Sequence, residues 1–183
     1  MSNSSSLYDQ SSSFGWISIA LHWSTAVAVI ALWLVGKSIS WLPAEDIDAR
    51  RSLHIMIGLI AWLPLVLRIV WRWKVKHPRA FGQSARTHTV ARVTHYLILA
   101  ALAVMILSGP VMAFFLPETN SLTNIALTLH ANAANVLLML IVLHVGGALK
   151  HLMFHDDETV ARIFVPRRNG SANVDAEDWK KVG

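Results

Sequence analysis

Four long, predominantly apolar stretches alternate with short polar segments along the chain. They cover residues 14–36, 52–73, 89–116 and 122–153. Each is long enough to cross the hydrocarbon core of a bilayer as a helix, which takes about 20 residues. The pattern predicts an all-α, integral membrane four-helix bundle with a four-span domain over residues 14–155.

The two ends of the chain are polar. Residues 1–13 are rich in serine and contain no Lys or Arg, so they lack the positive start of a signal peptide. We expect a short disordered tail there. Residues 156–183 mix acidic and basic side chains and predict a polar C-terminal tail, with one interfacial helix around 158–165.

Basic residues set the expected orientation. The segment 68–92 holds seven Lys or Arg residues and no acid, whereas the third connection has Glu118 and no base. Because positive residues stay on the cytoplasmic side, we expect both termini of this multi-pass membrane protein in the cytoplasm. The net charge of +5 follows from this topology and gives no reason to expect a nucleic-acid partner. Membrane lipid headgroups are the simplest partner for the basic segment.

The chain contains no cysteine. This excludes disulfides, iron–sulfur clusters held by thiolates, and covalent haem attachment through C-x-x-C-H. Nine histidines therefore remain as the candidate nitrogen ligands for a redox metal.

His130 and His144 lie 14 residues apart within one uncharged stretch. On a helix this spacing places both imidazoles on nearly the same face, about 21 Å apart along the axis. One helix then offers a nitrogen ligand near each side of the membrane, as two stacked redox centres require. The alternative is two histidines that hydrogen-bond neighbouring helices.

The expected topology sorts the other histidines by depth. His54 begins the second span at the outer side, level with His130, and His22 lies at the inner side, level with His144. A low-spin b-type haem needs two imidazoles on facing helices, so the pairing predicts two haem b groups. His95 lies at the inner depth on the third span and is a rival to His22 or His144 as ligand.

Two other features suit a haem. Arg68 lies 14 residues after His54 and about 21 Å deeper, where a charge is costly unless it is paired. We expect it to meet a propionate of the inner haem, with Arg72 one turn nearer water; a lipid phosphate is the rival partner. Gly58, one turn after His54, allows a flat macrocycle to approach the backbone, although ordinary helix packing explains it equally well.

Over residues 14–168 the sequence resembles the prokaryotic cytochrome b561 family, the stand-alone di-haem b cytochromes of the bacterial inner membrane. The matching segments are ISIALHW at 17–23, LHIMIG at 53–58, VLRIVWRWKVKHP at 66–78, THY at 94–96, LHANAAN at 129–135 and LHVGGALKH at 143–151. The resemblance implies His22, His54, His130 and His144 as haem ligands, with His95 not usually among them. It also implies electron transfer to ubiquinone, with superoxide as donor.

Charge and position suggest roles for the polar residues near each side in such electron transfer. Lys37, Arg50 and Arg51 lie near the outer haem and would attract anionic superoxide. Lys150 and His151 lie at the inner surface and would donate to a quinone oxygen or supply its protons, unless they simply face headgroups.

Three functions remain possible: two kinds of electron transfer and a structural or transport bundle without haem. The leading one is a superoxide:quinone oxidoreductase that moves single electrons across the membrane. The second is a membrane-anchor electron-relay subunit that serves a larger periplasmic dehydrogenase or hydrogenase.

Overall fold

Four long helices form the molecule. The computed structural model describes residues 7–9, 14–75, 85–115, 120–154 and 163–164. The helices are α1 (Trp16–Ile39), α2 (Ile47–Lys74), α3 (Ala85–Phe115) and α4 (Ser121–Phe154), with a short 3₁₀ helix, η1 (Ala44–Asp46), before α2. The described residues contain no strand. The predicted all-α four-helix bundle is confirmed.

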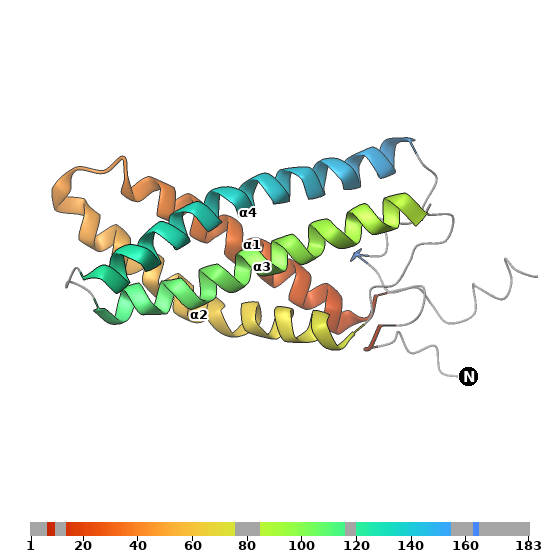
Figure 1. Ribbon diagram of the computed structural model, residues 1–183, viewed down its shortest axis with the longest axis horizontal. Helices are drawn as coiled ribbons and strands as arrows, with labels where there is room; N and C mark the ends of the chain where they lie inside the picture. The colour runs from red at the N-terminus through yellow and green to blue at the C-terminus, as the bar shows by residue number, and fades with distance from the viewer. Residues whose placement is uncertain (1–6, 10–13, 76–84, 116–119, 155–162, 165–183) are drawn as a thin grey trace, which may run out of the picture.

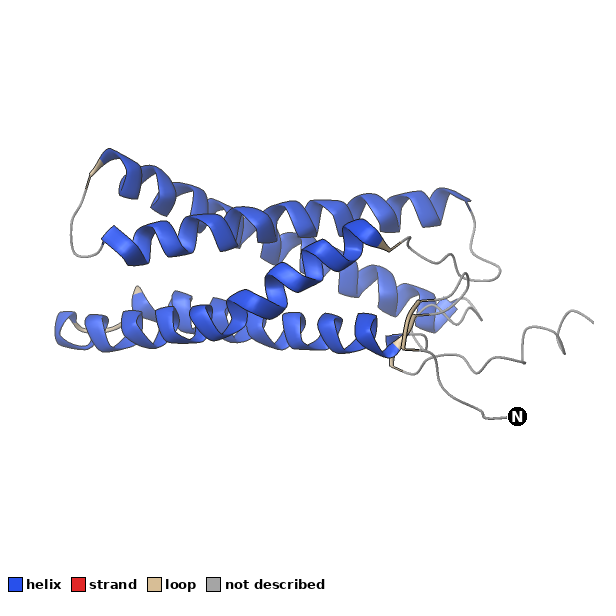
Figure 2. Cartoon of the chain, turned by 90° about the horizontal axis from the view of Figure 1, so that it is seen from below, coloured by secondary structure: helices blue, strands red, loops and turns tan. Residues whose placement is uncertain are grey.

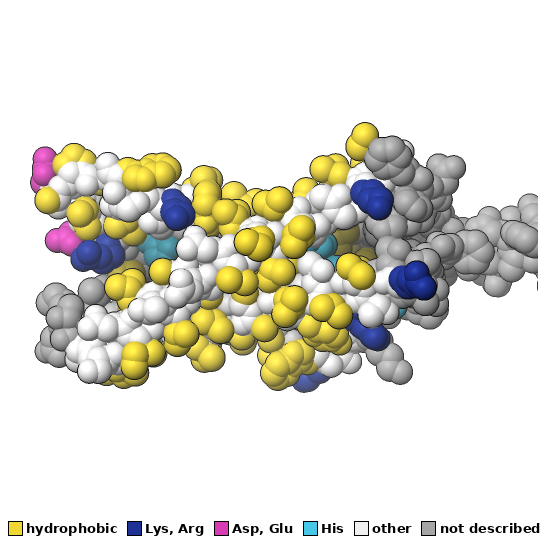
Figure 3. All heavy atoms as spheres, turned by 45° about the horizontal axis from the view of Figure 1, so that its top comes forward, with side chains coloured by type: hydrophobic (Ala, Val, Ile, Leu, Met, Phe, Trp, Pro, Cys, Tyr) yellow, Lys and Arg dark blue, Asp and Glu magenta, His cyan; other side chains and the backbone are white. Residues whose placement is uncertain are grey.

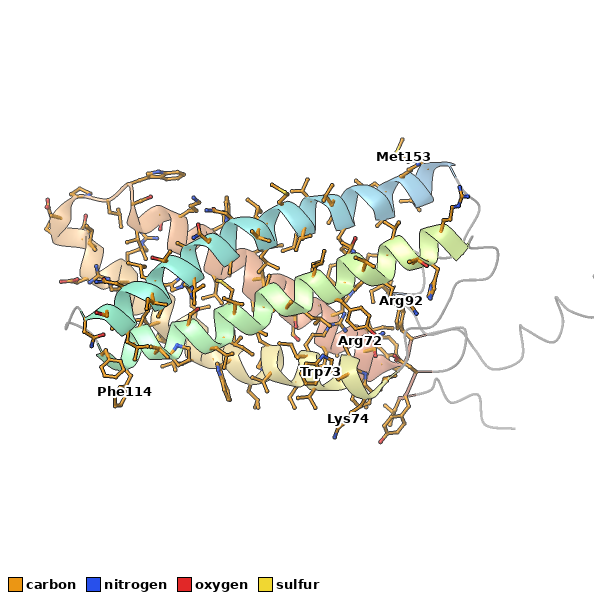
Figure 4. All side chains as sticks on the ribbon, in the orientation of Figure 1. Arg72, Trp73, Lys74, Arg92, Phe114 and Met153 are labelled. Atoms are coloured by element: carbon orange, nitrogen blue, oxygen red, sulfur yellow. The ribbon has the colours of Figure 1, made fainter. Side chains whose placement is uncertain are left out.

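The helices run up and down along one long axis (Figures 1 and 2). We call the end where α1 begins the near end; α2 ends, α3 begins and α4 ends there (Figure 1). Arg72, Trp73 and Lys74 of α2 lie at the near end with Arg92 of α3 (Figure 4). The far end holds η1, the α1–α2 connection and Phe114 (Figures 1 and 4).

The helices are long and apolar enough to cross a membrane, and their apolar side chains lie mainly on the outside. In the apolar stretch of each span, no more than 22% of the residues are buried inside the protein. Large apolar side chains such as Ile60 and Leu107 are exposed, and apolar atoms cover the middle of the molecule, with Lys and Arg toward its two ends (Figure 3). Such a surface is stable against lipid and not against water.

The core lies between α2, α3 and α4. It consists of mid-sized and small apolar side chains: Ala61, Leu65, Ile69, Leu99, Ala101, Leu102 and Leu137. Small residues let helix backbones approach closely in a membrane. Helix α3 packs against α4, α1 against α2, and α2 against α3. Among the described residues, α4 meets α1 and α2 only sparsely.

A proline inside α3 explains one tie between helices. Pro110 has no N–H, so it cannot donate to the carbonyl oxygen of Ile106, four residues earlier. The indole Nε1 of Trp62 on α2 donates to this oxygen at 3.2 Å. The helix therefore continues through the proline, and a side chain of another helix satisfies the carbonyl that the proline leaves open.

Residues 7–9 fold back over the start of α1, within the stretch whose composition predicts a disordered tail. The Asp9 carboxylate accepts the Gly15 N–H at 2.8 Å and pairs with Arg72 at 3.2 Å. The Tyr8 ring stacks on Trp71, with centroids 6.0 Å apart. A Cβ at Gly15 would collide with the backbone of Tyr8, so only glycine permits this approach. Electrostatic pairing with α2 orders these three residues.

The helices extend beyond the apolar stretches that predicted them. Helix α2 begins at Ile47, before the charged residues Asp48, Arg50 and Arg51, and α3 begins at Ala85. Hydrogen bonding continues a helix past the hydrocarbon boundary, where polar side chains meet water. Most of the interfacial helix expected around 158–165 lies outside the described residues, as does much of the basic connection. Ile163 and Phe164 are described, and both contact Trp23 of α1.

Candidate functional site

The far-end pair consists of His54 from α2 and His130 from α4. Their ring centroids are 6.2 Å apart and their planes are inclined by 79°. Both rings are partly buried between the helices. The predicted partners therefore do face one another.

The near-end pair consists of His22 from α1 and His144 from α4. Their ring centroids are 6.3 Å apart, with an angle of 63° between the planes. Helix α4 thus contributes one imidazole to each pair, and its two histidines are separated by the 14-residue spacing of the sequence, about 21 Å along the axis.

The ring separations match two ligands on opposite sides of one metal ion. A metal–imidazole bond is about 2 Å and the bonded nitrogen lies about 1 Å from the ring centroid, which puts the two centroids about 6 Å apart. Both pairs have this spacing. The described residues contain no group of three or more His, Cys, Asp or Glu side chains able to hold a metal ion. Each pair thus offers two ligands, the number that an iron needs when a macrocycle supplies the rest.

His95 lies beside the near-end pair but differs from it in geometry. Its ring centroid is 4.8 Å from that of His144, which is too short for a metal bound linearly between the two rings. Its Nδ1 donates to the carbonyl oxygen of Ala91 at 2.6 Å, one helical turn earlier. The structure places His95 against His144, at the level of the near-end pair.

A polar cluster surrounds His22. Arg68 is 9% exposed, and its guanidinium donates to Ser18 O and to His22 Nδ1, both at 3.2 Å. The Trp71 indole donates to the Ser18 hydroxyl at 2.7 Å. Arg68 therefore lies level with His22, as its distance from His54 predicted, and α1 and α2 are joined by hydrogen bonds at this level.

Three residues near the far-end pair were not singled out as site residues from the sequence. The Ser108 hydroxyl of α3 lies 2.9 Å from His130 Nδ1. A Cβ at Gly109 would lie 3.5 Å from His130 Cε1, and a Cβ at Gly36 would lie 3.1 Å from His54 Cε1. A Gly-Pro dipeptide such as 109–110 is typical of a bend in a helix and not of a contact with histidine, so no signal in the sequence identifies these three residues as neighbours of the pair.

The surroundings of Gly58 leave space. A Cβ there would meet only the side chain of Leu32, at 3.8 Å, among the described residues. Helix α4 also approaches α1 and α2 only sparsely along the described chain, yet its two histidines meet rings from both helices. A flat group held between the paired rings is compatible with this arrangement.

The residues predicted to interact with the electron donor and those predicted to interact with the quinone lie at opposite ends of the bundle. Lys37 lies in the last turn of α1 and Arg50 in the first turn of α2, at the far end. Arg51 donates to Asp48 at 3.0 Å. Lys150 is exposed at the near-end terminus of α4. The backbone of His151 is helical, but its side chain lies outside the described part of the chain.

Comparison with known proteins agrees with this architecture. The family model "Prokaryotic cytochrome b561" matches residues 13–166. Two Escherichia coli K12 relatives are similar: cytochrome b561 homolog 2, 28% identical over 82% of this chain and 90% of its own length, and cytochrome b561 homolog 1, 25% identical over 82% and 95%. With two facing histidine pairs in a four-helix membrane bundle, the chain belongs to the prokaryotic cytochrome b561 family, membrane electron-transfer proteins for which the family implies b-type haem.

Proposed function

We propose that this protein is a di-haem b cytochrome of the bacterial inner membrane that moves single electrons from periplasmic superoxide to ubiquinone. The observation that supports this most is the pair of ring separations, 6.2 Å at the far end and 6.3 Å at the near end. Two redox centres at these levels would span most of the hydrocarbon core, which is about 30 Å thick.

His54 and His130 would hold one haem and His22 and His144 the other. When bound, each haem supplies a centre that accepts and releases one electron. His95 is set aside as an axial ligand because its centroid lies only 4.8 Å from that of His144. Its Nδ1–H bond to Ala91 O instead holds the ring against its own helix, α3, where it packs beside His144.

Arg68 would pair with a propionate of the near-end haem. An imidazole that binds metal through Nε2 keeps its proton on Nδ1, so His22 would then no longer accept from the guanidinium. A buried guanidinium needs an anionic partner, and a carboxylate suits its planar geometry. Arg72 is already paired with Asp9, so we assign it a supporting part in the charge balance of the near end.

The near end would face the cytoplasm. Of the basic connection, the described residues include Arg72 and Lys74 at the end of α2 and Arg86 and Arg92 at the start of α3. Acidic side chains visible in Figure 3 lie at the far end. The excess of Lys and Arg in short loops favours this orientation.

Superoxide would give its electron at the far end. Oxidation of two superoxide anions releases two O₂ and supplies the two electrons that, with two protons, convert one quinone to quinol. Lys37 and Arg50 would attract the anion by steering. Arg51 would contribute less because Asp48 already neutralises it at 3.0 Å.

Ubiquinone would accept the electrons at the near end. Lys150 and His151 on the last turns of α4 are proposed to stabilise the developing negative charge and to deliver protons. His151→Leu should leave both haem spectra and haem reduction by superoxide intact. Reoxidation by quinone should slow about tenfold or more; unchanged reoxidation would remove His151 from the quinone site.

The test of the proposal is the haem content of single-histidine variants. A pyridine haemochrome assay should give two haems per polypeptide in the unaltered protein. His54→Leu and His130→Leu should each remove the same spectral component, and His22→Leu and His144→Leu the other. One haem or none in the unaltered protein would refute electron transfer across the membrane.

The donor is tested separately. A superoxide-generating system should reduce the haems of the purified protein, and added ubiquinone should reoxidise them. Haems that are fully present but inert to superoxide would favour a relay subunit for a periplasmic dehydrogenase or hydrogenase.

A further inference from the structure

Ser108 is a buried hydroxyl that faces a histidine of another helix. It lies on α3 and is 6% exposed. Its oxygen is 2.6 Å from the carbonyl oxygen of Val104 and 2.9 Å from His130 Nδ1. A serine in a membrane helix commonly bonds to the carbonyl one turn earlier. The contact with an imidazole on α4 is the additional feature.

The chemistry of these two contacts fixes the direction of each hydrogen bond. A carbonyl oxygen only accepts, so the single hydroxyl proton of Ser108 goes to Val104 O. The serine oxygen can then only accept from His130, which requires the proton of the neutral imidazole to be on Nδ1. The other ring nitrogen, Nε2, keeps its lone pair and is free to bind a metal.

Gly109, next to Ser108 in the chain, lies against the same edge of the His130 ring. A Cβ at Gly109 would lie 3.5 Å from His130 Cε1 and 3.9 Å from Nδ1. The Nδ1–Cε1 edge of the imidazole therefore rests on α3, where a hydroxyl and an unobstructed backbone adjoin it. Contact along this edge orients the plane of the ring as well as its tautomer.

We propose that Ser108 is a positioning residue for His130, setting the tautomer and donor strength of this imidazole as a ligand of the far-end haem. The inference rests on the proposed function, in which His130 binds that haem. A hydrogen bond from Nδ1–H makes an imidazole a stronger electron donor to its metal. A stronger donor stabilises the oxidised metal, so removal of the hydroxyl should favour the reduced form.

The test uses the purified haem-loaded protein with Ser108→Ala and Ser108→Thr. Ser38→Ala is the matched control, because the Ser38 hydroxyl makes a similar bond within α1, to Val35 O at 2.7 Å. The readouts are haem per polypeptide, a redox titration resolved into two one-electron components, and the low-spin EPR signals of the oxidised protein.

Ser108→Ala should retain two haems and move one component only. At the midpoint of that component in the unaltered protein, the ratio of reduced to oxidised haem should rise about threefold or more, equivalent to about 30 mV. One EPR signal should shift with it. Ser108→Thr, which keeps the hydroxyl, should behave as the unaltered protein does, and Ser38→Ala should change neither component.

The remaining outcomes of these measurements either overturn or support the proposal. Full haem content with both components unchanged in Ser108→Ala would overturn the proposal, as would an equal shift or an equal haem loss in Ser108→Thr, which would indicate packing alone. Haem lost in Ser108→Ala and kept in Ser108→Thr would support it. A different result would show that the proposed function is wrong: His130→Leu would retain both haems, independently of the results for the serine variants.

Discussion

Because the ion pair between Asp9 and Arg72 is buried, we predict that removing one of its charges lowers the free energy of unfolding substantially. The two side chains are 2% and 9% exposed and their charged atoms lie 3.2 Å apart. At an effective dielectric constant of about 20, this distance corresponds to about 5 kcal/mol of attraction. Desolvation of both groups offsets part of it, but removing one partner leaves the other buried without a counter-charge.

Asp9→Asn should therefore destabilise the protein by about 3 kcal/mol, at the lower end of the range for broken buried pairs. The substitution has nearly the same shape, and its amide oxygen can still accept the Gly15 N–H that Asp9 accepts at 2.8 Å. The loss then reports mainly the charge, including its favourable interaction with the N-terminus of α1.

The chain offers a matched control in an exposed pair of the same chemistry. Arg51 and Asp48 are 3.0 Å apart, but their side chains are 44% and 89% exposed. Asp48→Asn should change stability by no more than about 1 kcal/mol, because water screens exposed pairs.

The measurement is reversible unfolding of the purified protein in mixed micelles, followed by tryptophan fluorescence. Double-mutant cycles with Arg72→Gln and Arg51→Gln isolate each coupling energy. If the coupling between Asp9 and Arg72 is no larger than that between Asp48 and Arg51, the burial argument is wrong.

Three further predictions follow from single contacts. Gly36→Ala should displace the ring of His54 and alter the far-end haem spectrum, because the new Cβ would lie 3.1 Å from Cε1. At Gly58 the protein atoms leave room for a Cβ. Loss of haem in Gly58→Ala would therefore indicate that a macrocycle lies against Gly58. Trp62→Phe removes a hydrogen bond of 3.2 Å to α3 and should lower stability by about 0.5–1.5 kcal/mol in the same unfolding assay. His95→Leu should keep two haems in the haemochrome assay; loss of one would make His95 a ligand.

The helices and the pairing by depth could be predicted because both depend on distances along single helices. Apolar length identifies a span, and the rise per residue gives the level of each histidine once the orientation is assumed. The same arithmetic placed Arg68 at the level of His22, where the structure has it bonded to that ring. These quantities need no knowledge of how the helices rotate against one another.

Contacts that depend on helix rotation could not be predicted. The sequence does not show that Ser108 faces His130, that Trp62 reaches the carbonyl of Ile106, or that His95 meets His144 at a shorter distance than His22 does. Serine and tryptophan occur commonly in membrane helices without such partners. Only the packed arrangement of the four helices distinguishes these contacts.

The two histidine pairs differ in the electrostatic surroundings that the protein gives them. The near-end ring of His22 lies 3.2 Å from the buried Arg68 guanidinium, whereas the far-end ring of His130 meets the neutral hydroxyl of Ser108. Even when it pairs with a haem propionate, Arg68 offsets the negative charge of that group, and a positive charge in a poorly screened interior favours whichever redox state is less positive. The near-end centre should therefore hold an electron more tightly, which directs electrons from the far end to the near end, as the proposed function requires. In the two-component titration, the component of higher potential should be the one that His22→Leu removes; loss of the lower one instead would mean that Arg68 does not set the direction.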